Sequence, residues 1–213
     1  MKKNIPNIIT SINFLLGWTS IYFAFLGEIY WSVGLILFAS LFDYLDGFAA
    51  RKLNVQSALG AQLDSFADLI TFGVAPAIIV YSVSTLSMFF LEKEVEFWLF
   101  IILGLIPLIG AIRLAKFNTA VKESSFFIGL PIPAFALITV SLTLTYLEYS
   151  SWIVNVSNYQ VFLPITILSI SFLMVSKWRF ISLKIKNLNF KTNKLIYMWV
   201  FSSIICLVFL IIF

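Results

Sequence analysis

All aspartates of this sequence lie in one short stretch, and their spacing would place the side chains of each pair on one face of a helix. Asp43, Asp46, Asp64 and Asp68 are the only aspartates in 213 residues. The first two are three positions apart and the last two are four apart, so on helices each pair shares a face. Between the pairs lies the segment KLNVQSALG, which we interpret as a short connection between two helices. We therefore expect two antiparallel helices whose carboxylates face one another.

Four carboxylates side by side need cations or protons, and Arg51 can offset one of them. Oxygen ligands favour a hard divalent ion, above all Mg²⁺, with Mn²⁺ or Ca²⁺ as alternatives. Two such ions would neutralise the group and suit displacement at phosphorus, where they would clamp the pyrophosphate of a nucleotide substrate. The small residues Gly47, Ala50 and Gly60 interleave with the aspartates. They leave room either for a flat ligand moiety or for close helix packing.

Two other interpretations of the aspartate group stay open at this point. One is a buried ion-pair network that only fixes the positions of helices. The other is a cation or proton transporter, because carboxylates inside a membrane often mark an ion route. Such a route usually distributes its carboxylates across the membrane, whereas these gather at one end of their helices.

The rest of the sequence predicts a membrane protein that positions these helices. Its residues are 61% hydrophobic and 11% charged, and its mean hydropathy is +1.02, whereas soluble domains carry about 25% charged residues. Several apolar segments reach the roughly 20 residues that cross a bilayer. We expect an all-α integral membrane protein, a polytopic bundle of about seven transmembrane helices, built as a single domain over residues 1–213 with a core at about 5–178. The predicted spans are 8–27, 31–52, 61–86, 96–119, 131–149, 160–178 and an extra C-terminal span at 195–213.

Charge indicates the orientation of the bundle. Thirteen of the 14 lysines and arginines fall in the gaps or at the span ends on one side of the predicted bundle, and only Lys93 falls on the other. The positive-inside rule therefore places the N-terminus and the aspartates toward the cytoplasm, in the cell membrane. We interpret the basic segment KWRFISLKIKNLNFKTNK as a cytoplasmic loop that attracts anionic lipid, and expect no nucleic acid as a partner. The chain has no histidine and one cysteine, Cys206, which excludes an intrachain disulfide and a thiol–zinc site.

The stretch DYLDGFAARKLNVQSALGAQLDSFAD resembles the CDP-alcohol phosphatidyltransferase pattern D-x2-D-G-x2-A-R-x8-G-x3-D-x3-D at every fixed position. The resemblance implies a membrane-embedded enzyme, commonly a homodimer, that transfers a phosphatidyl-type group from a CDP-linked lipid to an alcohol and releases CMP. It implies two divalent ions held by Asp43, Asp46 and Asp64, with Asp68 as general base and further ligand. It also implies a nucleotide and phosphate site that contains Gly47, Ala50, Arg51 and Gly60. The segment IPNIIT resembles the N-terminal part of the family and adds Asn7 and Thr10, for which helix capping is an equal alternative.

Three further segments, DSFADLITFGVAPA, IRLAKFN and FFIGLPIPA, resemble the phosphatidylserine synthase branch of that family, over about residues 5–135. This implies CDP-diacylglycerol as donor and L-serine as acceptor. Arg113 and Lys116 would pair with the serine carboxylate and Asn118 would offer hydrogen bonds, although the two cations also fit a pair that snorkels at a helix end. The segment Gly129–Pro133 is either a loop or a wall of the acceptor pocket. Relatives that use glycerol phosphate or inositol phosphate as acceptor, or an archaeal-type ether-lipid donor, remain alternatives.

Overall fold

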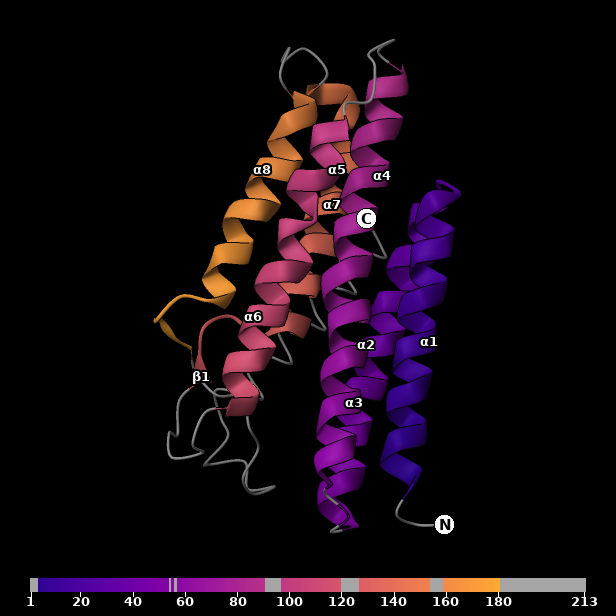
Figure 1. Cartoon of the computed structure of the whole chain (residues 1–213). Coiled ribbons are helices and arrows are strands. Elements are labelled where there is room, and N and C mark those ends of the chain that lie inside the picture. Colours follow the sequence, from indigo (N-terminus) through magenta and orange to yellow (C-terminus); the bar gives the residue numbers. More distant parts are fainter. Residues whose placement is uncertain are drawn as a thin grey trace, which may run out of the picture.

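The computed structural model is a bundle of helices that run close to one common axis (Figure 1). It describes residues 4–53, 55, 57–90, 97–119, 127–153 and 159–180. The α-helices are α1 (Ile5–Phe25), α2 (Ile29–Lys52), α3 (Ala58–Asp68), α4 (Ala75–Phe90), α5 (Phe97–Leu103), α6 (Leu105–Thr119), α7 (Ile132–Ile153) and α8 (Tyr159–Ser171). A π-helical segment, η2 (Leu69–Val74), joins α3 to α4, and a 3-10 segment, η3 (Phe172–Met174), follows α8.

The predicted membrane spans agree with these helices. Four helical segments of the described chain are long and apolar enough to cross a membrane: Ile5–Phe25, Ile29–Lys52, Ala58–Leu86 and Phe97–Thr119. Two shorter apolar helices, Ile132–Glu148 and Val161–Met174, coincide with the fifth and sixth predicted spans. The seventh predicted span, 195–213, lies outside the described residues. The protein is therefore a multi-pass, membrane-embedded helical bundle.

One small feature departs from the all-helical expectation. The strands β1 (Phe127–Ile128) and β2 (Arg179–Phe180) pair antiparallel, so the sixth predicted span ends before residue 178. The Gly129 amide donates to the Trp178 carbonyl at 2.9 Å, and the Leu130 amide donates to the Leu173 carbonyl at 3.0 Å. Gly129 has φ +76°, and a Cβ there would overlap the Met174 carbonyl oxygen. The entry to α7 is thereby held against the end of α8.

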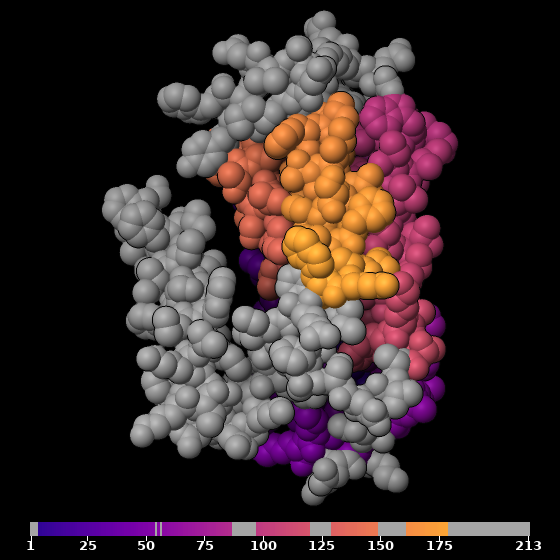
Figure 2. Space-filling model, turned by 90° about the vertical axis from the view of Figure 1, so that its left-hand side faces the viewer, coloured from indigo at the N-terminus to yellow at the C-terminus, as the bar shows by residue number. Residues whose placement is uncertain are grey.

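The long continuous helix formed by α3, η2 and α4 is central to the bundle (Figure 1). Phe72, Ile79 and Val83 on it are fully buried, as is Phe135 on α7. Helix α8 lies between α7 and the α5–α6 pair on the face shown in Figure 2. Large apolar side chains such as Trp18 of α1 are more than half exposed, as expected where a helix faces lipid rather than water.

Small and hydroxyl-bearing side chains bring α1 close to its neighbours. The Ser20 and Ser32 hydroxyls lie 2.9 Å apart and join α1 to the antiparallel α2. Thr71 in η2 donates to the Asn13 carbonyl oxygen at 3.1 Å. A Cβ on Gly17 would overlap Thr71 Oγ1, so only glycine allows this contact. Helix α1 is thus packed against α2 and against the helix formed by α3 and η2, the two helices that carry the aspartates.

Candidate active site

The aspartate-bearing helices meet through a short, capped connection. Helix α2 ends at Lys52, where the Leu53 amide bonds to the Ala49 carbonyl at 2.9 Å. Helix α3 begins after Ser57, whose side chain accepts a hydrogen bond from the Gly60 amide at 3.0 Å. Serine is a favoured residue at this N-cap position because it satisfies a free helix amide. The connection places the C-terminal end of α2 beside the N-terminal end of α3, as the aspartate spacing predicts.

Three of the four carboxylates converge. One oxygen each of Asp43, Asp64 and Asp68 lies within 4.8 Å of the other two, a geometry that could hold a metal ion. The Asp43 and Asp68 side chains are close enough to share a hydrogen bond. Like charges at this separation repel one another unless a proton or a cation lies between them. We call Asp43, Asp64 and Asp68 the carboxylate trio.

The carboxylate trio also has unused hydrogen-bonding capacity. One oxygen of Asp64 and one of Asp68 are buried and have no hydrogen-bond partner among the described residues. Buried polar atoms in folded proteins are normally paired, so such oxygens mark a place where a ligand or an ion belongs. The donor set consists of carboxylate oxygens alone, which suits a hard divalent cation. The predicted metal site therefore fits the geometry, although the geometry does not select one ion.

Asp46 has a separate environment beside the trio. It is 5% exposed, and its Oδ2 accepts a hydrogen bond of 2.7 Å from the Thr10 hydroxyl, which also lies 3.0 Å from the Pro6 carbonyl oxygen. Its charge is close enough to interact with Asp43 and Asp64. The predicted set of four ligands is thus brought into one region, with Asp46 held on the α1 side.

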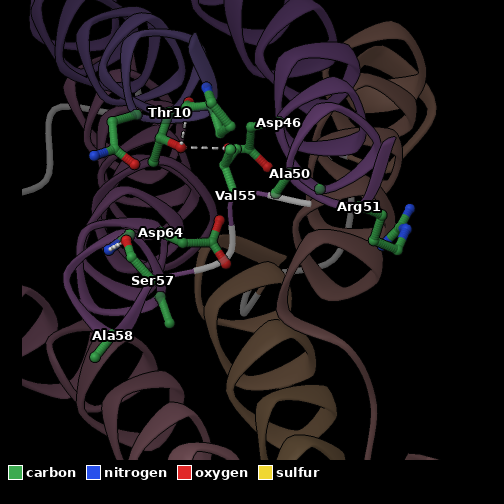
Figure 3. Close-up of a pocket in the computed structure, with 13 residues that line it drawn as sticks. Thr10, Asp46, Ala50, Arg51, Val55, Ser57, Ala58 and Asp64 are labelled. Carbon is green, nitrogen blue, oxygen red and sulfur yellow. Dashed lines mark hydrogen bonds between the residues drawn. The ribbon is translucent and has the colours of Figure 1, made fainter. Parts of the chain in front are cut away.

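A pocket of about 490 Å³ opens next to Asp46 and Asp64 (Figure 3). Helices α1, α2 and α3 and the α2–α3 connection contribute its walls, which are lined by Pro6, Asn7, Thr10, Asp46, Gly47, Ala50, Arg51, Val55, Ser57, Ala58, Gly60, Ala61 and Asp64. All six residues predicted to bind the nucleotide portion of a CDP-lipid, namely Asn7, Thr10, Gly47, Ala50, Arg51 and Gly60, belong to this lining. The pocket is large enough for a small ligand.

The small residues of the pocket have distinct surroundings. A Cβ on Gly60 would lie 3.0 Å from Asn7 Oδ1 and 3.0 Å from Ser57 Oγ, so glycine here lets α1 approach α3 closely. A Cβ on Gly47 would meet only Arg51 Nη1, at 3.5 Å. The Arg51 side chain points away from Thr10 and Asp64 in Figure 3. Close helix packing therefore accounts for Gly60, while Gly47 borders open space.

The residues predicted to bind the acceptor fall into different settings on α6. Arg113 is half-buried, its charge interacts with that of Asp68, and its Nε is buried without a hydrogen-bond partner in the described part of the chain. Lys116 is exposed. Asn118 Nδ2 donates to Ser65 Oγ at 2.9 Å, between Asp64 and Asp68 in the sequence of α3. Arg113 and Asn118 thus both interact with the aspartate helix, but only Arg113 is half-buried, and Asn118 is exposed like Lys116.

Several residues of the site carry no strong signal in the sequence alone. Ser57 forms the N-cap of α3, and Ser65 accepts a hydrogen bond from Asn118. The π-helical turn directly follows Asp68, and such turns are frequent at functional sites. A serine three residues before a glycine could have suggested the cap, but nothing in the local sequence predicts a π-helical turn.

Comparison with known proteins identifies the class to which this fold and site belong. Residues 3–175 match the family model of CDP-alcohol phosphatidyltransferase. The chain therefore belongs to the CDP-alcohol phosphatidyltransferase family, which confirms the resemblance of the aspartate stretch. Membership favours a transferase over an ion transporter, and over a purely structural ion-pair network.

Curated relatives indicate the branch. The chain is 37% identical to "CDP-diacylglycerol--serine O-phosphatidyltransferase" of Bacillus subtilis over 83% of this chain and 89% of the relative. It is 34% identical to the Helicobacter pylori protein of the same name over 87% of this chain and 75% of the relative. It is also 37% identical to "Archaetidylserine synthase" of Methanothermobacter thermautotrophicus, over 66% of this chain and 58% of that protein. The predicted resemblance to the phosphatidylserine synthase branch is confirmed.

Proposed function

We propose that this protein transfers the phosphatidyl group of CDP-diacylglycerol to the hydroxyl of L-serine, giving phosphatidylserine and CMP. The observation that carries this proposal is the environment of the carboxylate trio: Asp64 lines the pocket of about 490 Å³, and Asp68 interacts with the half-buried Arg113. A donor on one side and an acceptor on the other would meet at the trio. The names of the Bacillus subtilis and Helicobacter pylori relatives support the same reaction.

The donor is assigned to the pocket. Asn7 and Thr10 on α1 and Gly47, Ala50, Arg51 and Gly60 around the α2–α3 connection would contact the cytidine and its phosphates. Backbone that is uncovered at a glycine allows a flat base to approach closely. The apolar tails of the lipid would stay in the bilayer along the exposed apolar faces of the helices.

The acceptor is assigned to the Arg113 side of the trio. The unpaired Nε of Arg113 is suited to a charge-assisted hydrogen bond with the serine carboxylate. Asn118 is held by Ser65 and would add a polar contact at the same edge, and Lys116 would contribute charge from the surface.

Asp68 would accept the proton of the serine hydroxyl. The serine oxygen then bonds to the phosphatidyl phosphorus, the bond from that phosphorus to the bridging oxygen breaks, and CMP leaves.

Divalent ions, Mg²⁺ or Mn²⁺ with Ca²⁺ as a possible occupant, would supply charge neutralisation at the phosphates when bound. Asp43, Asp64 and Asp68 would hold one ion, and Asp46 would complete a second site with the trio. The support for this assignment is the oxygen-only donor set and the two buried, unpaired carboxylate oxygens.

The site is assigned to the cytoplasmic side of the cell membrane. Arg51 and Lys52 at the end of α2 and Lys116 at the end of α6 lie at the end of the bundle that carries the aspartates. This agrees with the positive-inside rule and lets a polar amino acid arrive from the cytoplasm. We also expect a single domain and a homodimer. The mass of the purified protein in detergent or nanodiscs would test the homodimer.

A panel of acceptors tests the proposed function. Purified protein with CDP-diacylglycerol should release CMP with serine, and much less with ethanolamine, glycerol 3-phosphate or inositol phosphate. A better rate with a phosphorylated acceptor would overturn the serine assignment. Because one relative is named archaetidylserine synthase, a CDP-linked ether lipid belongs in the panel as a second candidate donor.

A further inference from the structure

Asn13 on α1 is a buried polar residue that the proposed reaction does not yet use. Its side chain is 0% exposed, and neither Oδ1 nor Nδ2 has a hydrogen-bond partner among the described residues. A buried carboxamide that stays unpaired on both sides is unfavourable, since two donors and two acceptor sites are withdrawn from water. Its position in the bundle indicates which group could be its hydrogen-bond partner.

The contacts between α1 and α2 place Asn13 at the level of Asp43. Thr10 bonds to Asp46 and Ser20 bonds to Ser32, and these two contacts show the antiparallel register of the helices. One turn beyond Thr10 on the same buried face of α1 is Asn13. One turn before Asp46 on α2 is Asp43, so the two residues lie opposite each other.

The contacts with the aspartate helix place Asn13 at the level of Asp68. Asn7 adjoins Gly60 near the start of α3, and Thr71 bonds to the Asn13 carbonyl oxygen, so α1 and the α3–η2 helix run in the same direction. One turn before Thr71 is Asp68. Asn13 therefore lies at the height where the carboxyl groups of Asp43 and Asp68 contact each other.

We propose that Asn13 is a positioning residue of the active site, whose Nδ2 donates a hydrogen bond to the buried, unpaired oxygen of Asp68. Both atoms lack a hydrogen-bond partner among the described residues, and the proposed bond would give each of them one. A neutral donor stabilises a carboxylate among other carboxylates without adding a charge that would repel a cation. The bond would hold Asp68 with its other oxygen directed toward Asp43 and the reacting hydroxyl. This inference rests on the proposed function for the role of Asp68.

The test replaces Asn13 by leucine, which has a similar size and no hydrogen bonds, and by alanine in case the leucine variant does not fold. Ser20→Ala is the matched control, because it removes a buried polar group from the same face of α1 two turns away. Two readouts are measured on each variant: Mn²⁺ affinity of the substrate-free protein by electron paramagnetic resonance, and kcat and KM for serine-dependent CMP release. Loss of a partner that orients a metal-binding carboxylate typically weakens metal affinity or activity by about 10–100-fold.

We expect Asn13→Leu and Asn13→Ala to weaken Mn²⁺ binding by at least about 10-fold and to lower kcat with little change in KM for serine, while Ser20→Ala retains both values. Wild-type Mn²⁺ affinity and kcat in a folded Asn13 variant would overturn the inference, as would equal losses in Ser20→Ala. If the wild-type protein releases no CMP with serine but Asn13→Leu still weakens Mn²⁺ binding, the proposed function fails and the role of Asn13 stands.

Discussion

The Thr10 hydroxyl donates a hydrogen bond of 2.7 Å to Oδ2 of Asp46 and so joins the start of α1 to the end of α2. Asp46 is almost fully buried, so this bond satisfies a carboxylate oxygen that has little access to water. The same two residues line the pocket assigned to the CDP-lipid. The N-terminal segment thus contributes to the pocket, and helix capping does not explain Thr10, which lies inside α1.

Replacing Thr10 by valine should weaken the donor site. The change keeps the shape of the side chain and removes a hydrogen bond to a charged group, which is worth about 1.5–3 kcal/mol, or roughly 10- to 100-fold in affinity. We expect the KM for CDP-diacylglycerol to rise by that factor, with little change in the KM for serine. Thr19→Val is the control, because the Thr19 hydroxyl is exposed and bonds only within α1. An unchanged donor KM in Thr10→Val would remove this bond from the binding site.

Asp68→Asn should lower turnover while leaving CDP-lipid binding largely intact. A general base typically contributes about 10²- to 10⁴-fold, and the amide cannot accept the hydroxyl proton. Asp43→Asn and Asp64→Asn should weaken metal binding as well, which Mn²⁺ titration of each variant would measure. Near-normal turnover in Asp68→Asn would exclude Asp68 as the general base. A loss of metal binding equal to that of Asp43→Asn would indicate that Asp68 is chiefly a metal ligand.

Removal of divalent metal should abolish transfer. The trio brings three carboxylates within 4.8 Å of one another, and such a group needs counter-charge before a phosphate can approach it. Treatment with a chelator should stop CMP release, and added Mg²⁺ or Mn²⁺ should restore it. Full activity of metal-stripped protein would show that protons alone neutralise the site.

Arg113→Gln should raise the KM for serine by roughly 10- to 100-fold, because it removes a charge-assisted hydrogen bond of about 1.5–3 kcal/mol. Lys116→Gln is the matched control on the same helix: Lys116 is exposed, so we expect a smaller effect. Ethanolamine lacks the carboxylate and should be nearly indifferent to the Arg113 change. Equal losses for CDP-lipid and serine would place Arg113 in the phosphate site or in the fold.

Gly17→Ala should destabilise the bundle. A Cβ there would overlap Thr71 Oγ1 and lie 2.6 Å from Thr71 Cα, so backbone would have to move. Overpacking of this kind costs about 1–3 kcal/mol. Gly34→Ala is the control, because a Cβ on Gly34 meets nothing within 4 Å. Thermal unfolding in detergent should show a lower midpoint for Gly17→Ala alone, and equal midpoints would argue against the close α1–η2 contact.

The sequence predicted the helices and the convergence of the aspartates because both follow from local periodicity. Asp43 and Asp64 are brought together by a short connection, which leaves few arrangements for the two helices. The π-helical turn after Asp68 and the close contact of Gly17 with Thr71 depend on packing between distant segments. Local spacing carries no signal for either of them.

The same limit applies to the polar residues around the site. Arg113 and Lys116 looked equivalent by spacing, yet only Arg113 is enclosed against Asp68, because burial is decided by neighbouring helices. The position of Asn13 in an apolar span predicts neither its complete burial nor the lack of hydrogen-bond partners among the described residues.

The most direct measurement follows isotope-labelled serine in a reaction with CDP-diacylglycerol and the purified protein. The proposed function predicts one molecule of CMP for each serine that becomes linked to lipid. Asp68→Asn should form both products much more slowly. CMP released without incorporation of serine, or serine-independent release at the same rate, would contradict a phosphatidyl transfer to serine.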